Sequence, residues 1–427
     1  MPEPRERALL ALYDVFCGGK YSNMAVKERL NGDITGLDKS FVTGLVYGTV
    51  RYKLTIDYII RKNSDIKLKK MSKYVLLILE LGVYQIYFLD KVPDRAAVDE
   101  SVKLAKRYAP RSTGFINAVL RASAKNKDSL SFPTGRIEYL SLKYSFTEEM
   151  LKKLSGLDFL EELLESLNAE PKTTIRINTL KGGGVSIENA EVTPSDKYKY
   201  AAYVSGTDIA ATREYKEGKF TVQDVAAMMP PLALSPKAGE LCVDVCAAPG
   251  GKTTHIAELM ENRGKIYAFD IHQHKIDIIN KNAKRMGIDI ISAMLHDSTE
   301  LYKPLAGKAD KVLADVPCSG IGIISGKPDI KWNKEDISEL PKLQLKILNI
   351  AAEYLKIGGE LVYSTCTLLE EENEGVIMKF LEENKNFELS EIKVPSPVIG
   401  KNDGFVTLYP NFTGTSGFFI AKLKRCG

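Results

Sequence analysis

Two cysteines stand in settings where a thiol could act as a nucleophile. Cys318 follows a proline in "LADVPCSGIG", and Cys366 lies 48 residues further along in "LVYSTCTLLEEENEGV". Each follows a short apolar run typical of a buried strand, so we expect both thiols in loops at the carboxyl ends of strands. Most free cysteines are small buried apolar side chains, and the residues alone do not say which thiol would attack.

A glycine turn follows the first strand-like run of the same half of the chain. The stretch "VCAAPGGKTTHIAEL" joins that run to a helix-like segment. Paired glycines let a backbone approach a ligand closely, and open α/β sheets bind ligands outside the carboxyl ends of their strands. The spacing is neither GxGxxG nor that of a P-loop. We therefore predict a cofactor-binding loop made of Cys246, Ala247, Ala248, Pro249, Gly250, Gly251 and Lys252.

Three aspartates end the three strand-like runs that come next. Asp270 lies 20 residues after Gly250, and Asp297 and Asp315 close the third and fourth runs. A lone aspartate in such a place is commonly a helix cap. Three of them beside a glycine turn could together meet the ribose, the adenine amino group and the charged amino-acid end of S-adenosylmethionine. Lys252, at the unfavourable N-terminal end of a helix, is expected to face an anion, either a ligand carboxylate or an aspartate.

The cysteines and histidines as a whole indicate no disulfide framework and no metal. No pair of them has CxxC or metal-ligand spacing. Reduced thiols, and the lack of an apolar run of about 20 residues, favour a cytoplasmic protein that does not span a membrane.

The elements that position these residues lie in the second half of the chain. From about Gly239 onward the pattern predicts five parallel strands, "ELCVDVC", "KIYAFD", "IISAMLHD", "KVLAD" and "ELVYST", separated by helices or loops. "GFVTLYP" and "GFFIAKLK" predict a closing antiparallel hairpin. This order describes the class I methyltransferase variant of the Rossmann fold better than a dehydrogenase. Residues 238–427 are therefore predicted to form an α/β, Rossmann-like methyltransferase domain that uses S-adenosylmethionine.

Two further regions precede that domain. Residues 1–127 have apolar residues three and four apart, which predicts an all-α domain of five to seven helices. Residues 128–237 add the strand-like "TTIRINTL" and "AAYVSG" to helix-like segments, which predicts linker helices and a small α+β module. Residues 1–127 hold 23 Lys and Arg against 13 Asp and Glu, a net charge of +10, whereas the remainder has 36 against 42, or −6. Such a basic end is typical of proteins that bind polyanions, although solvated helix faces rich in lysine would give the same count.

The motifs resemble those of a known family. "VDVCAAPGGKTTHIAEL", "LADVPCSGIGIISGKPDIKW" and "YSTCTLLEEENEGVI" are similar to the signature motifs of the NOL/NOP/Sun RNA cytosine carbon-5 methyltransferases. The start of the chain, with "VPDRAAVDESVKLAKRYAPRSTGFINAVLRA", resembles the NusB-like RNA-binding domain of the bacterial 16S ribosomal RNA branch, the RsmB or Sun type. "TTIRINTLK" and "GKFTVQDVAAMMPP" resemble the small RNA-binding module of that branch. The likeness covers nearly the whole chain.

The resemblance implies methyl transfer from S-adenosylmethionine to carbon 5 of a cytosine in 16S ribosomal RNA. Carbon 5 is a poor nucleophile, so a thiolate first adds to the neighbouring carbon 6. By the family pattern Cys366 is the nucleophile and Cys318 helps to release the product. Asp315 is expected to hydrogen-bond the ring nitrogen or amino group of the base and also to border the cofactor. The target cytosine is expected in a single-stranded or unstacked site.

Two positions depart from the family pattern. Ser325-Gly326 stand where a basic pair is usual, which leaves Lys327 and Lys331 to contact an RNA phosphate. Ser416 stands where an aspartate is common, and this difference is expected to matter only to the hairpin.

Some residues and some functions stay open. Arg176, Asn178, Gln223 and Asp224 match the middle module and its junction without a role, and Trp332 belongs either to a core or to the base pocket. The alternative functions are a transfer RNA cytosine carbon-5 methyltransferase and a catalytically inactive RNA-binding assembly or antitermination factor. We expect a monomer whose partner is ribosomal RNA, with neither DNA nor a membrane as a partner.

Overall fold

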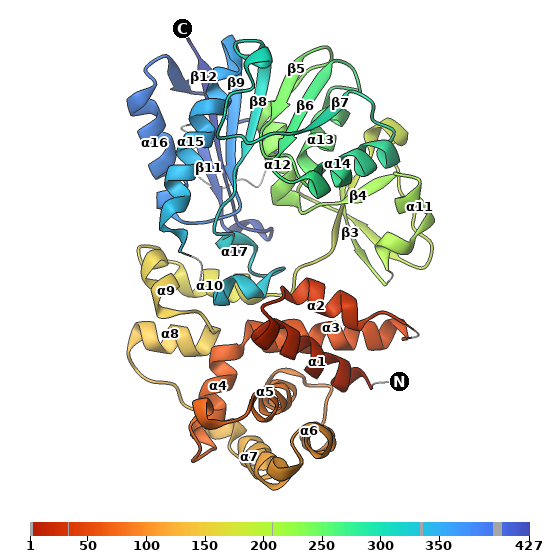
Figure 1. The fold of residues 1–427 in the computed structure, drawn as a ribbon, viewed down its shortest axis with the longest axis vertical. Coiled ribbons are helices and arrows are strands. Elements are labelled where there is room, and N and C mark those ends of the chain that lie inside the picture. The colour runs from red at the N-terminus through yellow and green to blue at the C-terminus, as the bar shows by residue number, and fades with distance from the viewer. Residues whose placement is uncertain (1–2, 33, 207, 334–335, 396–403) are drawn as a thin grey trace. The chain divides into compact units, whose positions relative to one another are not determined.

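The chain forms two compact units in the computed structural model, which describes residues 3–32, 34–206, 208–333, 336–395 and 404–427. One unit consists of Met1–Asn168 with Gly326–Asn333, and the other of Ala169–Ser325 with Lys334–Gly427 (Figure 1). The segment 326–333 is therefore part of the first unit although the residues on both sides of it belong to the second. The division into three domains at residues 127 and 237 stays a prediction.

Helices build the first unit. Its first seven α-helices fall within residues 1–127, as the apolar spacing predicts, and three more follow in the linker region. They are α1 Pro4–Gly18, α2 Ser22–Arg29, α3 Gly36–Arg51, α4 Lys53–Lys62, α5 Lys73–Phe88, α6 Asp94–Tyr108, α7 Thr113–Lys125, α8 Arg136–Tyr144, α9 Glu148–Leu154 and α10 Leu160–Asn168.

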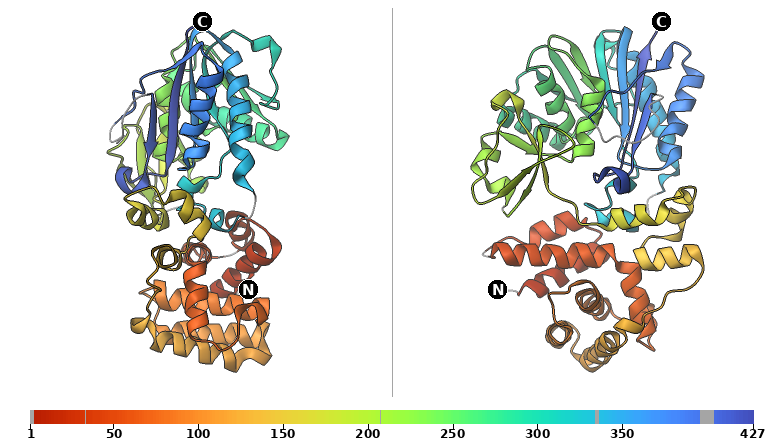
Figure 2. Two further views of the ribbon diagram at one scale, coloured as in Figure 1. Left: turned by 90° about the vertical axis from the view of Figure 1, so that its left-hand side faces the viewer. Right: turned by 180° about the vertical axis from the view of Figure 1, so that it is seen from behind.

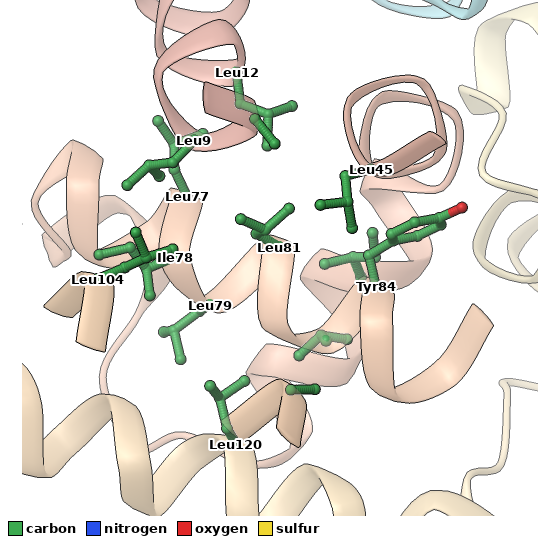
Figure 3. Close-up of a cluster of buried hydrophobic side chains, with 14 of the residues drawn as sticks. Leu9, Leu12, Leu45, Leu77, Ile78, Leu79, Leu81, Tyr84, Leu104 and Leu120 are labelled. Atoms are coloured by element: carbon green, nitrogen blue, oxygen red, sulfur yellow. The ribbon is translucent and has the colours of Figure 1, made fainter. Parts of the chain in front are cut away.

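Helix α5 lies in the middle of the core of this unit. Consecutive residues Leu77, Ile78 and Leu79 are all buried, so no face of the helix is left to solvent in that stretch. A helix that is apolar on every side is stable only when other elements surround it. Figure 3 shows the side chains that pack around it from α1, α3, α6 and α7, namely Leu9, Leu12, Leu45, Leu104 and Leu120.

The segment 326–333 is held in the first unit by side-chain hydrogen bonds. Asp329 accepts from the backbone N–H and from the hydroxyl of Ser22, at 3.0 and 2.6 Å. The indole N–H of Trp332 donates to the carbonyl of Val50 at 2.8 Å, and its ring packs against the helical core. The sequence leaves open whether Trp332 belongs to a core or to the base pocket. In the structure it belongs to the core of the helical unit.

A small antiparallel sheet opens the second unit. Its strands are β1 Thr174–Ile177, β2 Glu191–Pro194, β3 Ala201–Ser205 and β4 Phe220–Val222, in the order β2-β3-β1-β4. The two predicted strand segments contain β1 and β3. Ile175, Val204 and Phe220 form a buried core beneath the sheet, close to the short helix α11 Arg213–Lys216.

A larger mixed sheet forms the body of the second unit. Strands β5 to β9 are parallel, and β12 pairs antiparallel with β9, β10 and β11, so the path is β10-β12-β9-β8-β5-β6-β7 with β11 beside β12. The right-hand view of Figure 2 shows this sheet running from green strands at one edge to blue strands at the other. The five parallel strands and the closing hairpin are confirmed, whereas β10 is not predicted by the sequence. The strands are β5 Leu241–Asp244, β6 Lys265–Asp270, β7 Ile291–Leu295, β8 Ala309–Asp315, β9 Leu355–Thr365, β10 Phe387–Leu389, β11 Phe405–Leu408 and β12 Phe418–Arg425.

Helices cover both faces of the larger sheet. Along each strand successive side chains point to opposite faces. Accordingly Cys242 and Leu313 share a core with α12 and α13, whereas their neighbours Val243 and Val312 share another with α15 and α16. The helices are α12 Val225–Leu234, α13 Gly251–Leu259, α14 Gln273–Met286, α15 Leu340–Glu353, α16 Glu374–Glu383 and, before β12, α17 Pro410–Thr413.

Membrane-spanning helices and metal-binding clusters are both absent from the described residues. These residues contain no helix long and apolar enough to cross a bilayer. They also contain no group of three or more His, Cys, Asp or Glu side chains arranged to hold a metal ion.

Candidate active site

The loop after β5 turns sharply into α13. Gly250 has a φ of +96°, in the left-handed region that favours glycine, and a Cβ there would lie 3.4 Å from Ile279. The N–H of Ala247 donates to the carbonyl of Phe269 at 2.8 Å. The predicted cofactor loop thus lies at the carboxyl edge of the sheet, between the ends of β5 and β6.

The three predicted aspartates lie along the same edge. Asp270 is the last residue of β6, Asp315 is the last of β8, and Asp297 follows β7. The N–H of Thr299 donates to Asp297 at 2.9 Å, and this bond holds the pKa of Asp297 below its ordinary value. Burial raises the pKa of the Cys246 thiol, and the charges of Asp270 and Asp315 raise it further. Asp270 and Asp315 therefore lie close enough to Cys246 for their charges to affect its thiol.

A fourth acid, Asp244, is absent from the predicted site. It ends β5 and is 1% exposed, and its Oδ2 accepts from the hydroxyl of Thr253 at 2.7 Å. Its Oδ1 is buried without a hydrogen-bond partner among the described residues. Burial raises the pKa of this carboxyl to about 7. Buried polar atoms are normally hydrogen-bonded, so this oxygen suits a donor on a bound ligand. Its position, directly before the glycine loop, is the sequence signal that could have identified it.

Lys252 and Asp315 form an ion pair in the site. Lys252 Nζ lies 2.7 Å from Asp315 Oδ2, and the hydroxyl of Ser364 donates to Oδ1 at 2.8 Å. Burial works to lower the pKa of Lys252, but the charge and the hydrogen bond of Asp315 outweigh it, and the pKa is raised. The sequence leaves two partners open for Lys252, a ligand carboxylate or an aspartate. In the structure its partner is Asp315.

The two predicted thiols are in contact. Cys318 follows β8 by three residues and Cys366 follows β9 directly. Because these strands are parallel neighbours, their carboxyl ends meet at one edge. The two Sγ atoms are 3.0 Å apart in a hydrogen bond in which either sulfur could be the donor, and the N–H of Cys366 donates to Cys318 Sγ at 3.2 Å. Neither cysteine forms a disulfide.

Different charged and polar groups act near the two thiols. The hydrogen bond with Cys366, together with burial, raises the pKa of Cys318 well above its ordinary value. A raised pKa favours the protonated form of Cys318. The charge of Cys366 is in turn one of the influences that raise the pKa of Lys252, so this ammonium lies near the Cys366 sulfur. A cation beside a thiol favours the thiolate.

Close backbone contacts join the two cysteine loops to the start of β12. Gly322 N–H donates to the carbonyl of Cys366 at 2.9 Å, and Gly417 N–H donates to the carbonyl of Gly322 at 2.7 Å. A Cβ on Gly322 would lie 2.3 Å from the Gly417 carbonyl oxygen, so a larger residue does not fit. The closing hairpin thus lies beside the thiols.

Arg176 connects the small sheet to the cofactor loop. It is fully buried and lies on β1. Its Nη1 donates to the carbonyl of Gly251 at 2.7 Å, and its Nη2 donates to Thr254 at 2.9 Å and to Glu258 at 2.8 Å. A residue without a predicted role therefore holds the first turns of α13, and nothing in the sequence pattern pairs it with that helix.

The prediction that Lys331 contacts an RNA phosphate is wrong. Lys331 is 2% exposed, and its ammonium donates to the carbonyls of Arg51 and Tyr144 and to Asn168 Oδ1, at 3.0, 3.2 and 2.6 Å. With three hydrogen bonds its donors are all used inside the helical unit. Lys327 is exposed and stays a prediction for that contact.

Known proteins identify the family of this chain. A family model described as 16S rRNA methyltransferase RsmB/F matches residues 231–424, and a model of the NusB family matches residues 2–125. A probable ribosomal RNA small subunit methyltransferase B of Bacillus subtilis (strain 168) is 35% identical over 445 residues, with 99% of each chain covered. The chain belongs to the RsmB/F family. The NusB-like start and the methyltransferase fold expected from the resemblance are both confirmed.

Other known proteins are also similar to this RsmB/F chain. A ribosomal RNA small subunit methyltransferase B of Escherichia coli O1:K1 / APEC is 31% identical over 411 residues, which cover 93% of this chain and 92% of the relative. The crystal structure titled PH0851 has a TM-score of 0.81 at 28% identity and covers 100% of this chain and 99% of its own. A methyltransferase homolog protein from Pyrococcus horikoshii has a TM-score of 0.59 at 30% identity, covering 69% of this chain and 100% of its own.

Family membership fixes the coarse activity. The chain is an RNA methyltransferase, so it requires a methyl donor. The edge of the sheet that carries the glycine loop, the four aspartates and the paired thiols is its candidate active site.

Proposed function

We propose that this RsmB/F chain transfers a methyl group from S-adenosylmethionine to carbon 5 of a cytosine in 16S ribosomal RNA. The observation that carries the proposal is the contact of two thiols, 3.0 Å apart, beside the Lys252–Asp315 ion pair. A reaction at carbon 5 needs one group that adds to the ring and a second that assists release. The names of the relatives, small subunit methyltransferases, support the substrate.

The residues around the glycine loop fit S-adenosylmethionine. Gly250, in the left-handed region, allows the sharp turn of the loop at the carboxyl edge of the sheet, and Asp244 Oδ1 is a buried acceptor without a partner among the described residues. Asp270 would hold the ribose hydroxyls and Asp297 the adenine amino group. When bound, S-adenosylmethionine supplies an electrophilic methyl group on a positively charged sulfur.

Cys366 is the nucleophile in this proposal. Its thiolate, stabilised by the nearby ammonium of Lys252, forms a bond to carbon 6 of the cytosine. The electron pair of the double bond between carbons 5 and 6 becomes available at carbon 5, which accepts the methyl group. Asp315 would hold the ring nitrogen or the amino group of the base, and this contact makes carbon 6 more electrophilic.

Cys318 assists release. Once Cys366 is a thioether, neither the hydrogen bond from its thiol group nor its charge raises the pKa of Cys318 any longer, and burial is the larger of the causes that remain. Cys318 then loses its proton to solvent and takes the proton from carbon 5. The electron pair of that C–H bond re-forms the double bond and expels Cys366 as thiolate. In sum, carbon 5 exchanges a hydrogen for a methyl group, and one proton goes to solvent.

The two thiol variants test this scheme on 16S RNA with S-adenosylmethionine labelled in the methyl group. We expect Cys366→Ala to transfer no methyl and to form no RNA adduct. Cys318→Ala retains the attack but not the release, so we expect a protein–RNA complex that survives a denaturing gel. Swapped results would show that the roles of the thiols are reversed.

The substrate is tested in the same assay. Wild-type protein is expected to label 16S RNA and not a pool of transfer RNA, and the label is expected at 5-methylcytosine after nuclease digestion. Label on transfer RNA alone would show that transfer RNA, and not 16S RNA, is the substrate.

A further inference from the structure

Two adjacent buried residues bond separately to the two cysteine loops. Glu372 and Asn373 lie between β9 and α16 and are each 1% exposed. The sequence motif that contains them, "YSTCTLLEEENEGVI", also contains Cys366, and the reaction scheme gives them no task.

Glu372 bonds to the Cys318 loop. Its Oε2 accepts from the backbone N–H of Ser319 at 2.9 Å and from the side-chain amide of Gln344 at 2.8 Å. The same amide nitrogen of Gln344 donates to the carbonyl of Pro317 at 2.9 Å. The residues immediately before and after Cys318 are therefore both tied, directly or through Gln344, to one carboxylate oxygen.

Asn373 bonds to the Cys366 loop in the same way. Its Oδ1 accepts from the hydroxyl of Thr365 at 2.6 Å, and its Nδ2 donates to the carbonyl of Thr367 at 3.2 Å. Here too the residues on both sides of the cysteine are held. A direct bond between the hydroxyls of Ser319 and Thr367, at 2.7 Å, joins the two loops.

We propose that Glu372 and Asn373 are positioning residues that together set the register of the two thiols, Glu372 for Cys318 and Asn373 for Cys366. They are joined by one peptide bond, whereas the cysteines are 48 residues apart in the chain. Holding both loops from one dipeptide fixes the distance between the sulfurs. This inference rests on the proposed function, in which Cys366 attacks and Cys318 releases.

The chemistry of Glu372 fits this task. A carboxylate oxygen can accept two N–H donors at once and binds them more strongly than a neutral acceptor does. The two donors to Glu372 Oε2, from Ser319 and Gln344, lie on different elements. The charge of Glu372 also contributes to the raised pKa of Cys318, which keeps that thiol protonated until Cys366 has reacted.

The test separates the attack from the release in single-turnover assays on 16S RNA. Glu372→Gln removes the charge and weakens the hold on Ser319. We expect formation of the covalent adduct to stay within about twofold of wild type and its release to slow about tenfold or more, because a shift of about 1 Å in a reacting group is enough for such losses. Asn373→Ala, measured in the Cys318→Ala background so that the adduct accumulates, is expected to slow adduct formation about tenfold.

Controls distinguish positioning from a loss of folding. Glu370→Gln changes an exposed glutamate two residues away and is expected to alter neither rate. Gln344→Leu removes the amide that joins Glu372 to Pro317 and is expected to slow release in the same way as Glu372→Gln. The Asn373→Asp variant keeps the acceptor for Thr365 and is expected to recover part of the rate of adduct formation. Thermal melting of each variant measures folding.

The outcomes that overturn the inference are distinct from those that overturn the reaction scheme. If Glu372→Gln slows formation and release by the same factor, or slows neither, the residue does not position Cys318. If Asn373→Ala leaves adduct formation unchanged, it does not position Cys366. If Cys366→Ala and Cys318→Ala themselves fail to separate attack from release, the proposed function is wrong.

Discussion

Two lysines, one in each unit of the chain, lie in opposite surroundings. Lys252, with a side-chain exposure of 16%, faces the carboxylate of Asp315 and lies near the Cys366 thiol, and its pKa is raised. Lys331 is 2% exposed and bonds to carbonyl and amide oxygens, with its ammonium 3.8 Å from the centre of the Phe146 ring. Burial lowers the pKa of Lys331 well below its ordinary value.

The difference shows that burial alone does not reveal the task of a lysine. A lysine paired with a carboxylate next to a reactive group can stabilise charge that forms during a reaction. A lysine whose donors end on backbone carbonyls satisfies acceptors that would otherwise be buried and unpaired. The first is expected to matter to the reaction and the second to folding.

Lys252→Met gives the largest expected effect. The change removes the cation beside Cys366 and leaves Asp315 without its partner, so we expect kcat/KM for RNA methylation to fall about 1000-fold. The melting temperature should change little, since the pair is partly exposed. The control Lys379→Met removes an exposed lysine from α16 and should leave both quantities unchanged. Equal loss of activity and of thermal stability would contradict the contrast with Lys331.

Lys331→Met is expected to act on folding. Three buried oxygens lose their donor, so the helical unit should lose about 2–4 kcal/mol of stability. The midpoint of urea unfolding, followed by circular dichroism, measures this loss. The matched control is Lys327→Met, which changes an exposed lysine four residues earlier in the chain. A normal midpoint combined with weakened RNA binding would restore Lys331 as an RNA contact.

Arg176→Lys tests a third cation, which is buried and bonds both to a backbone carbonyl and to a carboxylate. A lysine cannot reach Gly251, Thr254 and Glu258 together, because it lacks the planar fork of arginine. The first turns of α13 should loosen, and we expect the KM for S-adenosylmethionine to rise about tenfold with a smaller change in kcat. Isothermal titration with S-adenosylhomocysteine provides an independent measurement. A change in kcat alone would argue against a role in holding the cofactor loop.

Asp244→Asn is expected to act on the pH dependence of stability. Burial raises the pKa of Asp244 to about 7, whereas an unfolded aspartate titrates near pH 4. Between these values the folded state binds more protons, so the carboxyl makes stability fall as the pH rises, by at most about 1.4 kcal/mol per pH unit. The asparagine variant should show a flatter curve of urea midpoint against pH from 5 to 7. Parallel curves for the two proteins would show that Asp244 is ionised throughout.

Much of the architecture follows from the sequence because it depends on local patterns. Alternation of short apolar runs with helices predicts the parallel strands β5 to β9, and the glycine pair predicts the turn at Gly250. Strand β10 escapes prediction because its three residues are too short to show a period. Asp270, Asp297 and Asp315 could be placed at one edge because all parallel strands end at the same side of their sheet.

Contacts between residues far apart in the chain could not be predicted from such local patterns. The contact of Cys318 with Cys366 requires β8 and β9 to be neighbours, and the order of strands in a sheet is not written in the period of any one of them. Arg176 meets Glu258 across 82 residues of sequence. Lys331 lies in a motif of the methyltransferase half, yet its bonds are to helices of the other unit, so its expected role was wrong.

The sequence by itself determined the residue types that chemistry needs, two thiols, a glycine loop and acids at strand ends, and it determined the family through their spacing. Only the tertiary structure decided which of these residues touch. It placed Lys252 against Asp315, brought Cys318 into contact with Cys366, and bonded Glu372 and Asn373 to the loops that carry the two thiols. The physical reason is that hydrogen bonds and charge interactions depend on distances in space, and packing brings together side chains that sequence separation keeps far apart.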